Sequence, residues 1–233
     1  MILEIREKNG RKYTLTLEGE RYCRCYPGDL QRLGFSEFSE GQNMEVFSEI
    51  LPEFERTVFL PRAKRRSLML LGKKEYTYRE MTKKLSTDGY PENVITEVLA
   101  WLAELHYVDD FSFAERYAFS LLSRCSEREI VQKMQQKGFE KELVKEALVA
   151  AKERYREERT GFNEFDVTSG VKEDFSAEQE AIRTFLRKKG YRSEESDKDK
   201  KKKLIMALYR KGFSMSDICA VMGEYEIEYE YNG

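Results

Sequence analysis

Three stretches of the chain align without gaps on a glycine, and this repeat constrains the fold more than any other feature. Each glycine has apolar residues eight and four positions before it, an aromatic residue directly after it, and apolar residues six and ten positions after it. This spacing predicts a helix that ends at a glycine with positive φ, followed almost at once by a second helix. The three sets are Met81, Leu85, Gly89, Tyr90, Ile95 and Leu99; Ile130, Met134, Gly138, Phe139, Val144 and Leu148; and Leu204, Leu208, Gly212, Phe213, Ile218 and Met222.

Helix-start signals agree with the glycine repeat. A hydroxyl residue followed three positions later by an acid is typical of a helix N-terminus. The pairs are Thr77 and Glu80, Ser126 and Glu129, and Ser214 and Asp217. A further helix is expected before each helix pair, over residues 63–71, 113–122 and 177–186. With only 4 prolines in 233 residues, we predict a mainly α fold of tandem three-helix repeats that form an elongated curved body.

The first 60 residues have a different pattern and predict a small β-rich N-terminal cap. Asn9-Gly10 stands between two alternating runs, which is a strong hairpin signal, and Gly19 marks a second turn. A third strand over 22–26 would place Cys23 and Cys25 on one face. Two short helices are expected at 29–33 and 43–58.

The repeat and the cap together predict five segments. These are the cap at 1–60, the first repeat at 61–108, the second repeat at 109–151, a linker at 152–175, and the third repeat with an acidic, tyrosine-rich tail at 176–233. Residues 152–159 should continue the preceding helix into solvent. Lys200–Lys203 is interpreted as a solvated loop, with a nucleic-acid contact as the alternative. The tail from Glu224 to Tyr231 is interpreted either as disordered or as an edge strand on the cap.

Little in the sequence favours catalysis. The chain has 4 cysteines and a single histidine, His106, and it lacks phosphate-binding glycine loops. We therefore expect no catalytic residue, no cofactor and no metal. Asp110 is interpreted as the cap of a helix that begins at Phe111, rather than as a metal ligand. No apolar run is long enough to span a membrane, so a cytoplasmic protein is expected.

Basic residues concentrate between positions 62 and 84. That stretch contains nine lysines and arginines and only two glutamates, although the whole chain has a net charge of -2. Helical spacing puts Arg62, Arg65, Arg66, Met69 and Lys73 on one outward arc. The pattern fits either a solvated face or a surface that binds phosphates or an acidic protein. The candidate contact residues are Arg62, Arg65, Arg66, Lys73 and Lys83.

The first and second repeats also carry sequence motifs of a known family. The residues concerned are 63–71, Tyr76 to Met81, Lys84-Leu85, Gly89-Tyr90, Leu102 to Ala114 with its Asp109-Asp110-x-x-Phe113-Ala114 string, and Gln132 to Phe139. In these the chain resembles the RecX family of recombination regulators. The likeness is good over 62–150 and looser over 176–223, where the lysine-rich insertion departs from the family pattern. The first 60 residues look like the extension of the family's longer members.

The resemblance implies a function in DNA repair and recombination and in the SOS response. It implies a non-enzymatic monomer that binds the RecA recombinase filament and inhibits its recombination, ATPase and co-protease activities. The basic residues would then contact the filament, or single-stranded or double-stranded DNA. The alternative is a direct DNA-binding protein with helix-turn-helix-like repeats. Against that alternative, the second helices at 92–98 and 140–146 carry at least as many acids as bases.

Overall fold

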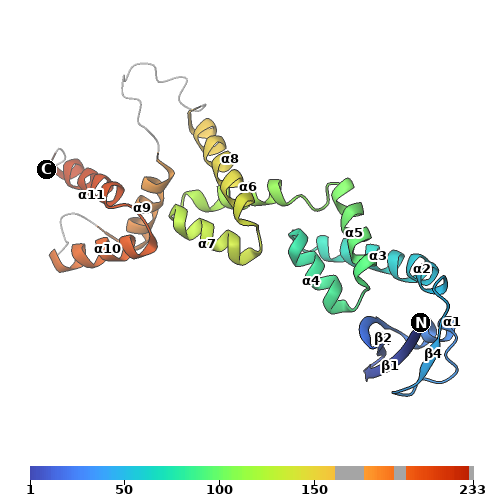
Figure 1. Cartoon of the computed structure of the whole chain (residues 1–233). Coiled ribbons are helices and arrows are strands. Elements are labelled where there is room, and N and C mark those ends of the chain that lie inside the picture. Colours follow the sequence, from blue (N-terminus) through green and yellow to red (C-terminus); the bar gives the residue numbers. More distant parts are fainter. Residues whose placement is uncertain (161–175, 192–197, 231–233) are drawn as a thin grey trace. The chain divides into compact units, whose positions relative to one another are not determined.

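The computed structural model describes residues 1–160, 176–191 and 198–230. The chain divides into two compact units, Met1–Asp109 and Asp110–Gly233. The described residues are mostly helical, with a small antiparallel sheet at the N-terminus (Figure 1). The predicted fold class is therefore confirmed. The five predicted segment boundaries and the elongated curved body stay predictions.

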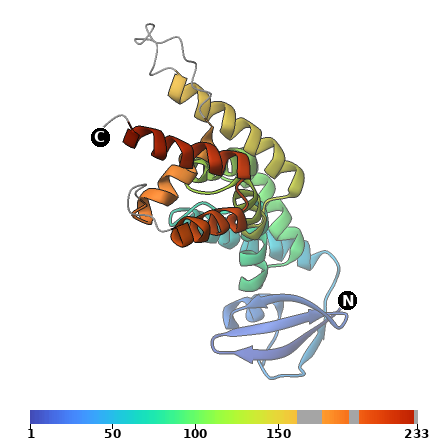
Figure 2. The same cartoon turned by 90° about the vertical axis from the view of Figure 1, so that its left-hand side faces the viewer.

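The cap of the first unit is a four-stranded antiparallel sheet with the order β3-β2-β1-β4. Its strands, seen side by side in Figure 2, are β1 (Ile2–Asn9), β2 (Lys12–Leu17), β3 (Glu20–Cys25) and β4 (Asn43–Glu45). The β1–β2 hairpin turns at Gly10, which has a φ of 60°. Cys23 and Cys25 are both buried on the inner face of β3, together with Leu15 of β2. The predicted hairpin and the predicted face of the third strand are confirmed.

The helix predicted at 43–58 is wrong in its first part. Asn43–Glu45 is instead strand β4, because pairing with β1 satisfies backbone groups on that sheet edge. The helical structure begins at Ile50 and continues without a break through three elements. These are α2 (Ile50–Phe54), the π-helix η1 (Glu55–Phe59) and α3 (Leu60–Leu71). The wide π turn, with Leu60 N–H bonded to Glu55 O, accommodates Pro61, which has no N–H to donate. The other predicted helix is present as α1 (Pro27–Leu33).

The first repeat consists of α3, α4 (Tyr78–Asp88) and α5 (Glu92–Glu104). Thr77 and Glu80 form the predicted capping box at the start of α4. Pro91 is the N-cap residue of α5. The sheet and the first repeat share one hydrophobic core, in which Leu3, Phe59 and Leu99 are all buried. The cap is therefore packed directly on the first repeat.

The second unit contains two three-helix repeats. The first is α6 (Asp110–Leu122), α7 (Glu127–Lys137) and α8 (Lys141–Thr160), and the second is α9 (Ala177–Lys188), α10 (Lys198–Lys211) and α11 (Met215–Glu230). Each repeat has its own buried core, and α8 packs along α6 (Figure 1). Gly89, Gly138 and Gly212 have φ values of 91°, 101° and 97°. The predicted glycine register is therefore confirmed in all three repeats.

A compact polar contact joins the two repeats of the second unit. The Ser126 hydroxyl accepts a hydrogen bond from Glu129 N–H at 3.2 Å, as a helix cap does, and donates to Lys211 O at 2.5 Å. The Lys211 ammonium lies 3.3 Å from the Glu129 carboxylate. The C-terminal end of α10 is therefore held against the N-terminal end of α7.

Four local predictions in the second unit need correction. Helix α6 begins at Asp110, so this acid lies in the first turn and not at a cap before Phe111. The extension of α8 is not wholly in solvent, because Tyr155 is buried with its ring 5.8 Å from that of Phe119. Lys200–Lys203 lies within α10 and not in a loop, since lysine is a good helix former.

The tail is the fourth correction. Residues 224–230 continue α11, so the tail up to Glu230 is neither disordered nor a strand. A helix that is already capped at Ser214 and anchored by Ile218 extends at little cost, because each added residue adds a hydrogen bond. Residues 161–175 of the predicted linker lie outside the described residues, and so does Tyr231 of the predicted tail.

Candidate interaction surface on the first repeat

The five candidate contact residues all lie in the first unit, but they fall into two groups. Arg62 and Arg66 of α3 are held in ion pairs with Asp29 and Asp88. Three others are exposed, and none of them has an ion pair among the described residues. These are Arg65 of α3, Lys73 just beyond α3, and Lys83 of α4. Folding therefore places acidic partners beside Arg62 and Arg66, which helical spacing alone puts on the same arc as Arg65 and Lys73.

Arg62 connects α3 to α1. Its guanidinium donates two hydrogen bonds to the Asp29 carboxylate, each 2.9 Å long, and lies 5.3 Å from the centre of the Tyr26 ring. Asp29 also accepts a hydrogen bond from Tyr26 N–H at 2.8 Å. Burial by itself would raise the pKa of Asp29, but the bonds from Arg62 and Tyr26 outweigh burial and hold that pKa below its ordinary value. Arg62 is therefore a structural residue.

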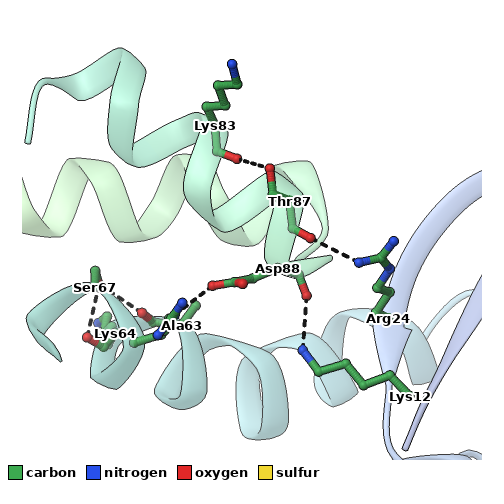
Figure 3. A network of polar contacts seen from close by, with 9 residues as sticks. Lys12, Arg24, Ala63, Lys64, Ser67, Lys83, Thr87 and Asp88 are labelled. Atoms are coloured by element: carbon green, nitrogen blue, oxygen red, sulfur yellow. Dashed lines mark hydrogen bonds and ion pairs between the residues drawn. The ribbon is translucent and has the colours of Figure 1, made fainter. Parts of the chain in front are cut away.

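Arg66 contacts a polar network at the C-terminal end of α4. Figure 3 shows the contacts of this network with Lys12 and Arg24. Arg66 Nε lies 2.7 Å from the Asp88 carboxylate. From the sheet, Lys12 Nζ donates to Asp88 O at 3.4 Å and an Arg24 guanidinium nitrogen donates to Thr87 O at 3.1 Å. Cations are stabilising at this end of a helix because its last carbonyls carry partial negative charge. The network clamps the sheet and α3 onto the end of α4.

The outer surface of α3 carries a mixed basic and apolar stripe, which we call the α3 stripe. It consists of Arg65, Leu68, Met69 and Lys73. Leu68 and Met69 are 42% and 58% exposed. Arg65, Leu68 and Met69 recur at helical spacing on one side of the helix, and Lys73 follows just beyond its end. Leu68 was not among the sequence candidates. The period of the apolar residues could have revealed it, because Leu68 lies off the buried face defined by Ala63, Ser67 and Leu70.

The first unit also contains a cleft of about 510 Å³ between β3, α4 and α5. Tyr22, Tyr78 and Tyr90 contribute to its walls. The Tyr22 hydroxyl donates a hydrogen bond to the buried Glu55 carboxylate, which also accepts one from Asn93. Burial and the bond to Glu55 raise the pKa of Tyr22, so this phenol stays protonated. The group stabilises the packing of β3 on η1 and α5.

The residues with potential reactivity are dispersed. His106 is exposed just beyond α5, at a φ of 55°. Cys23 is buried, and burial raises its pKa well above the ordinary value, which keeps the thiol unreactive. Within the described ranges, no three His, Cys, Asp or Glu side chains gather in a way that could hold a metal ion. No helix of the described chain is both long and apolar enough to cross a membrane.

Taken together, the fold and its surfaces define a protein of tandem three-helix repeats with an exposed basic and apolar stripe on the first of them. Two family models match the chain. The model for the first three-helix domain of RecX covers residues 63–102, and the model for the third covers residues 177–222. These matches confirm the predicted resemblance to the RecX family.

Relatives and solved structures agree with these matches. The chain is 26% identical over 145 residues to the regulatory protein RecX of Caldanaerobacter subterraneus, which covers 62% of this chain and 71% of the relative. It is 23% identical over 222 residues to the regulatory protein RecX of Leuconostoc mesenteroides, and this match covers 94% of this chain and 73% of the relative. A crystal structure of a regulatory protein RecX superposes with a TM-score of 0.52 at 18% identity, over 95% of this chain and 99% of the other. The crystal structure of RecX from Lactobacillus salivarius superposes with the same TM-score at 19% identity, over 72% of this chain and 97% of the other.

Proposed function

We propose that the protein binds the RecA recombinase filament and inhibits its recombination, ATPase and co-protease activities, without catalysing a reaction itself. Membership in a family of regulatory proteins supports a regulatory function. The α3 stripe is the observation that carries the binding part of the proposal. The proposal implies a monomer that acts in the cytoplasm on DNA repair and the SOS response.

The composition of the α3 stripe favours a protein partner. Arg65 and Lys73 stand at its two ends, and Leu68 and Met69 lie between them. Methionine and arginine are enriched in protein interfaces, and adjacent exposed apolar side chains mark interaction sites. An acidic surface with an apolar centre would complement this stripe. Of the predicted contact residues, Arg65, Lys73 and Lys83 are retained as contacts, and Arg62 and Arg66 are assigned to positioning α3.

Direct reading of duplex DNA by the helix pairs has less support. A helix-turn-helix protein inserts its second helix into the major groove, with N-terminal residues on the base edges. The corresponding helix α5 exposes Glu92, Asn93 and Glu97 at its start. Carboxylates at this position would repel the phosphates that flank the groove. For this reason we place the filament protein ahead of duplex DNA as the partner.

An ATPase assay of the cognate RecA on single-stranded DNA tests the proposal. The stripe variant carries Arg65→Glu, Met69→Ser and Lys73→Glu, and the control carries Arg79→Glu and Lys84→Glu in α4. Both change the net charge by −4, and all five positions are exposed. We expect the wild type to inhibit, the control to need about the same concentration, and the stripe variant to need at least about ten times more. Equal inhibition by all three proteins would refute the assignment of the stripe.

The same assay tests the non-enzymatic part of the proposal. The purified protein alone should hydrolyse neither ATP nor DNA, and His106→Ala should inhibit RecA as the wild type does. A hydrolytic activity that co-purifies with the protein and disappears in the His106→Ala variant would contradict it.

A further inference from the structure

Helix α10 carries the densest positive charge in the second unit. Lys198–Lys211 contains seven basic residues and one acid, although the whole chain has a net charge of -2. Leu208 is fully buried and fixes which side of the helix faces the core. At about 100° per residue, the exposed residues on the opposite side fall on an arc of about 140°. These residues, which we call the α10 face, are Lys198, Lys202, Lys203, Met206, Tyr209 and Arg210, and the exposed Asp199 lies among them near the middle of the arc.

The cations of the α10 face are available to a ligand. Among the described residues, no carboxylate lies within ion-pair distance of Lys198, Lys202 or Lys203. Arg210 donates from Nε to Met206 O at 3.2 Å, a bond that leaves its positive charge unpaired. Lys211, by contrast, points to the other side and is paired with Glu129. The face therefore presents four cations on one side of a single rigid helix.

An aromatic ring lies among these cations. Tyr209 and Met206 are each 55% exposed, and Tyr209 stands two helical turns from Lys202, so both lie on the same side of α10. An exposed ring beside lysines and arginines matches the chemistry of single-stranded nucleic acid binding, in which cations follow the phosphates and a base stacks on the ring. Bases in a duplex are stacked on each other and cannot use the ring in this way.

We propose that the α10 face binds single-stranded nucleic acid, with Lys198, Lys202, Lys203 and Arg210 on the phosphates and Tyr209 stacked on a base. The charge and the exposure of α10 support this surface independently of the α3 stripe. It goes beyond the proposed function, because it requires no recombinase. Binding to RecA and binding by α10 can therefore fail separately.

Fluorescence anisotropy with a labelled oligothymidylate tests the proposal on the full chain. The face variant carries Lys198→Gln, Lys202→Gln, Lys203→Gln and Arg210→Gln, in which glutamine keeps a helix propensity close to that of the original residues. The matched control carries Lys141→Gln, Lys145→Gln, Lys188→Gln and Lys189→Gln, which removes four exposed charges elsewhere in the same unit. Tyr209→Ala and Tyr209→Phe test the ring, with a duplex of the same length as the second probe.

We expect the wild type and the control to bind the single strand and the face variant to bind at least about ten times more weakly. Four phosphate contacts give a slope of log K against log salt of about −3, which the face variant should lose. Tyr209→Ala should weaken single-strand binding about fivefold or more, without a comparable effect on duplex binding, and Tyr209→Phe should bind like the wild type.

Three results would overturn the proposal. One is the absence of single-strand binding by the wild type at low salt. Another is equal binding by the face variant and the control. The third is a preference for duplex that Tyr209→Ala does not change, which would assign the cations to double-stranded DNA instead.

Discussion

Replacing Arg62 with alanine separates the structural arginines of α3 from those proposed as contacts. The change removes two hydrogen bonds to Asp29, a carboxylate whose side chain is only 6% exposed, and a cation–aromatic contact with Tyr26. Breaking a fully buried ion pair costs about 3–5 kcal/mol, and exposed pairs contribute about 0.2–1 kcal/mol. Because the Arg62 side chain is 34% exposed, we expect an intermediate loss of about 2 kcal/mol in the free energy of unfolding.

The loss should depend on pH with a defined sign. The pKa of Asp29 is lowered in the folded protein, so its ionised form contributes stability above the ordinary pKa of 3.8 and loses that contribution as the pH falls through the lower folded value. The difference in unfolding free energy between the wild type and Arg62→Ala should therefore be full at neutral pH. It should shrink below about pH 4, where the carboxylate becomes protonated.

Urea unfolding followed by tryptophan fluorescence measures this difference. Trp101 is the single tryptophan of the chain and packs against the core of the first unit, so its signal reports the unit that contains Arg62. Arg65→Ala is the matched control, because this arginine lies on the same helix and is exposed. Its effect should stay within about 0.5 kcal/mol. Equal midpoints for the Arg62→Ala and Arg65→Ala variants would refute the structural assignment of Arg62.

Two further substitutions test the junctions that the glycine register forms. A Cβ added at Gly89 would lie 2.5 Å from Arg24 Cβ, in a backbone with a φ of 91°. Gly89→Ala should therefore cost about 2–3 kcal/mol by the same urea assay, more than the roughly 1 kcal/mol of the φ penalty by itself. Ser126→Ala removes the cap of α7 and the bond to Lys211 O. It should lower the thermal unfolding temperature of the second unit, measured by circular dichroism, through a loss of about 1–2 kcal/mol, and Ser126→Thr should retain most of the stability. An unchanged transition in Ser126→Ala would contradict the junction.

The repeat could be read from the sequence because its signals are local. Gly89 marks a helix end, since few other residues adopt its backbone angles, and Thr77 marks a helix start through a bond to a residue three positions away. The edge strand β4 could not be read in this way. Its existence depends on pairing with Ile2 to Glu4, about 40 residues earlier in the chain, and no local pattern encodes that distance.

The candidate surface shows the same division between local and distant information. Sequence spacing identified a basic helix and placed Arg65 and Lys73 correctly on its outside. It also placed Arg62 and Arg66 on the outside, because helical periodicity carries no information about acidic residues on other elements that fold against the helix.

The sequence by itself thus determined the helical repeats, the capped helix starts and the concentration of cations around α3, because each depends on residues within one or two turns of each other. Only the tertiary structure decided which of those cations remain exposed. Asp29 lies 33 positions before Arg62, and Asp88 lies 22 positions after Arg66. An ion pair forms where folding brings charges within about 4 Å, and the fold, not the spacing along the helix, sets that distance.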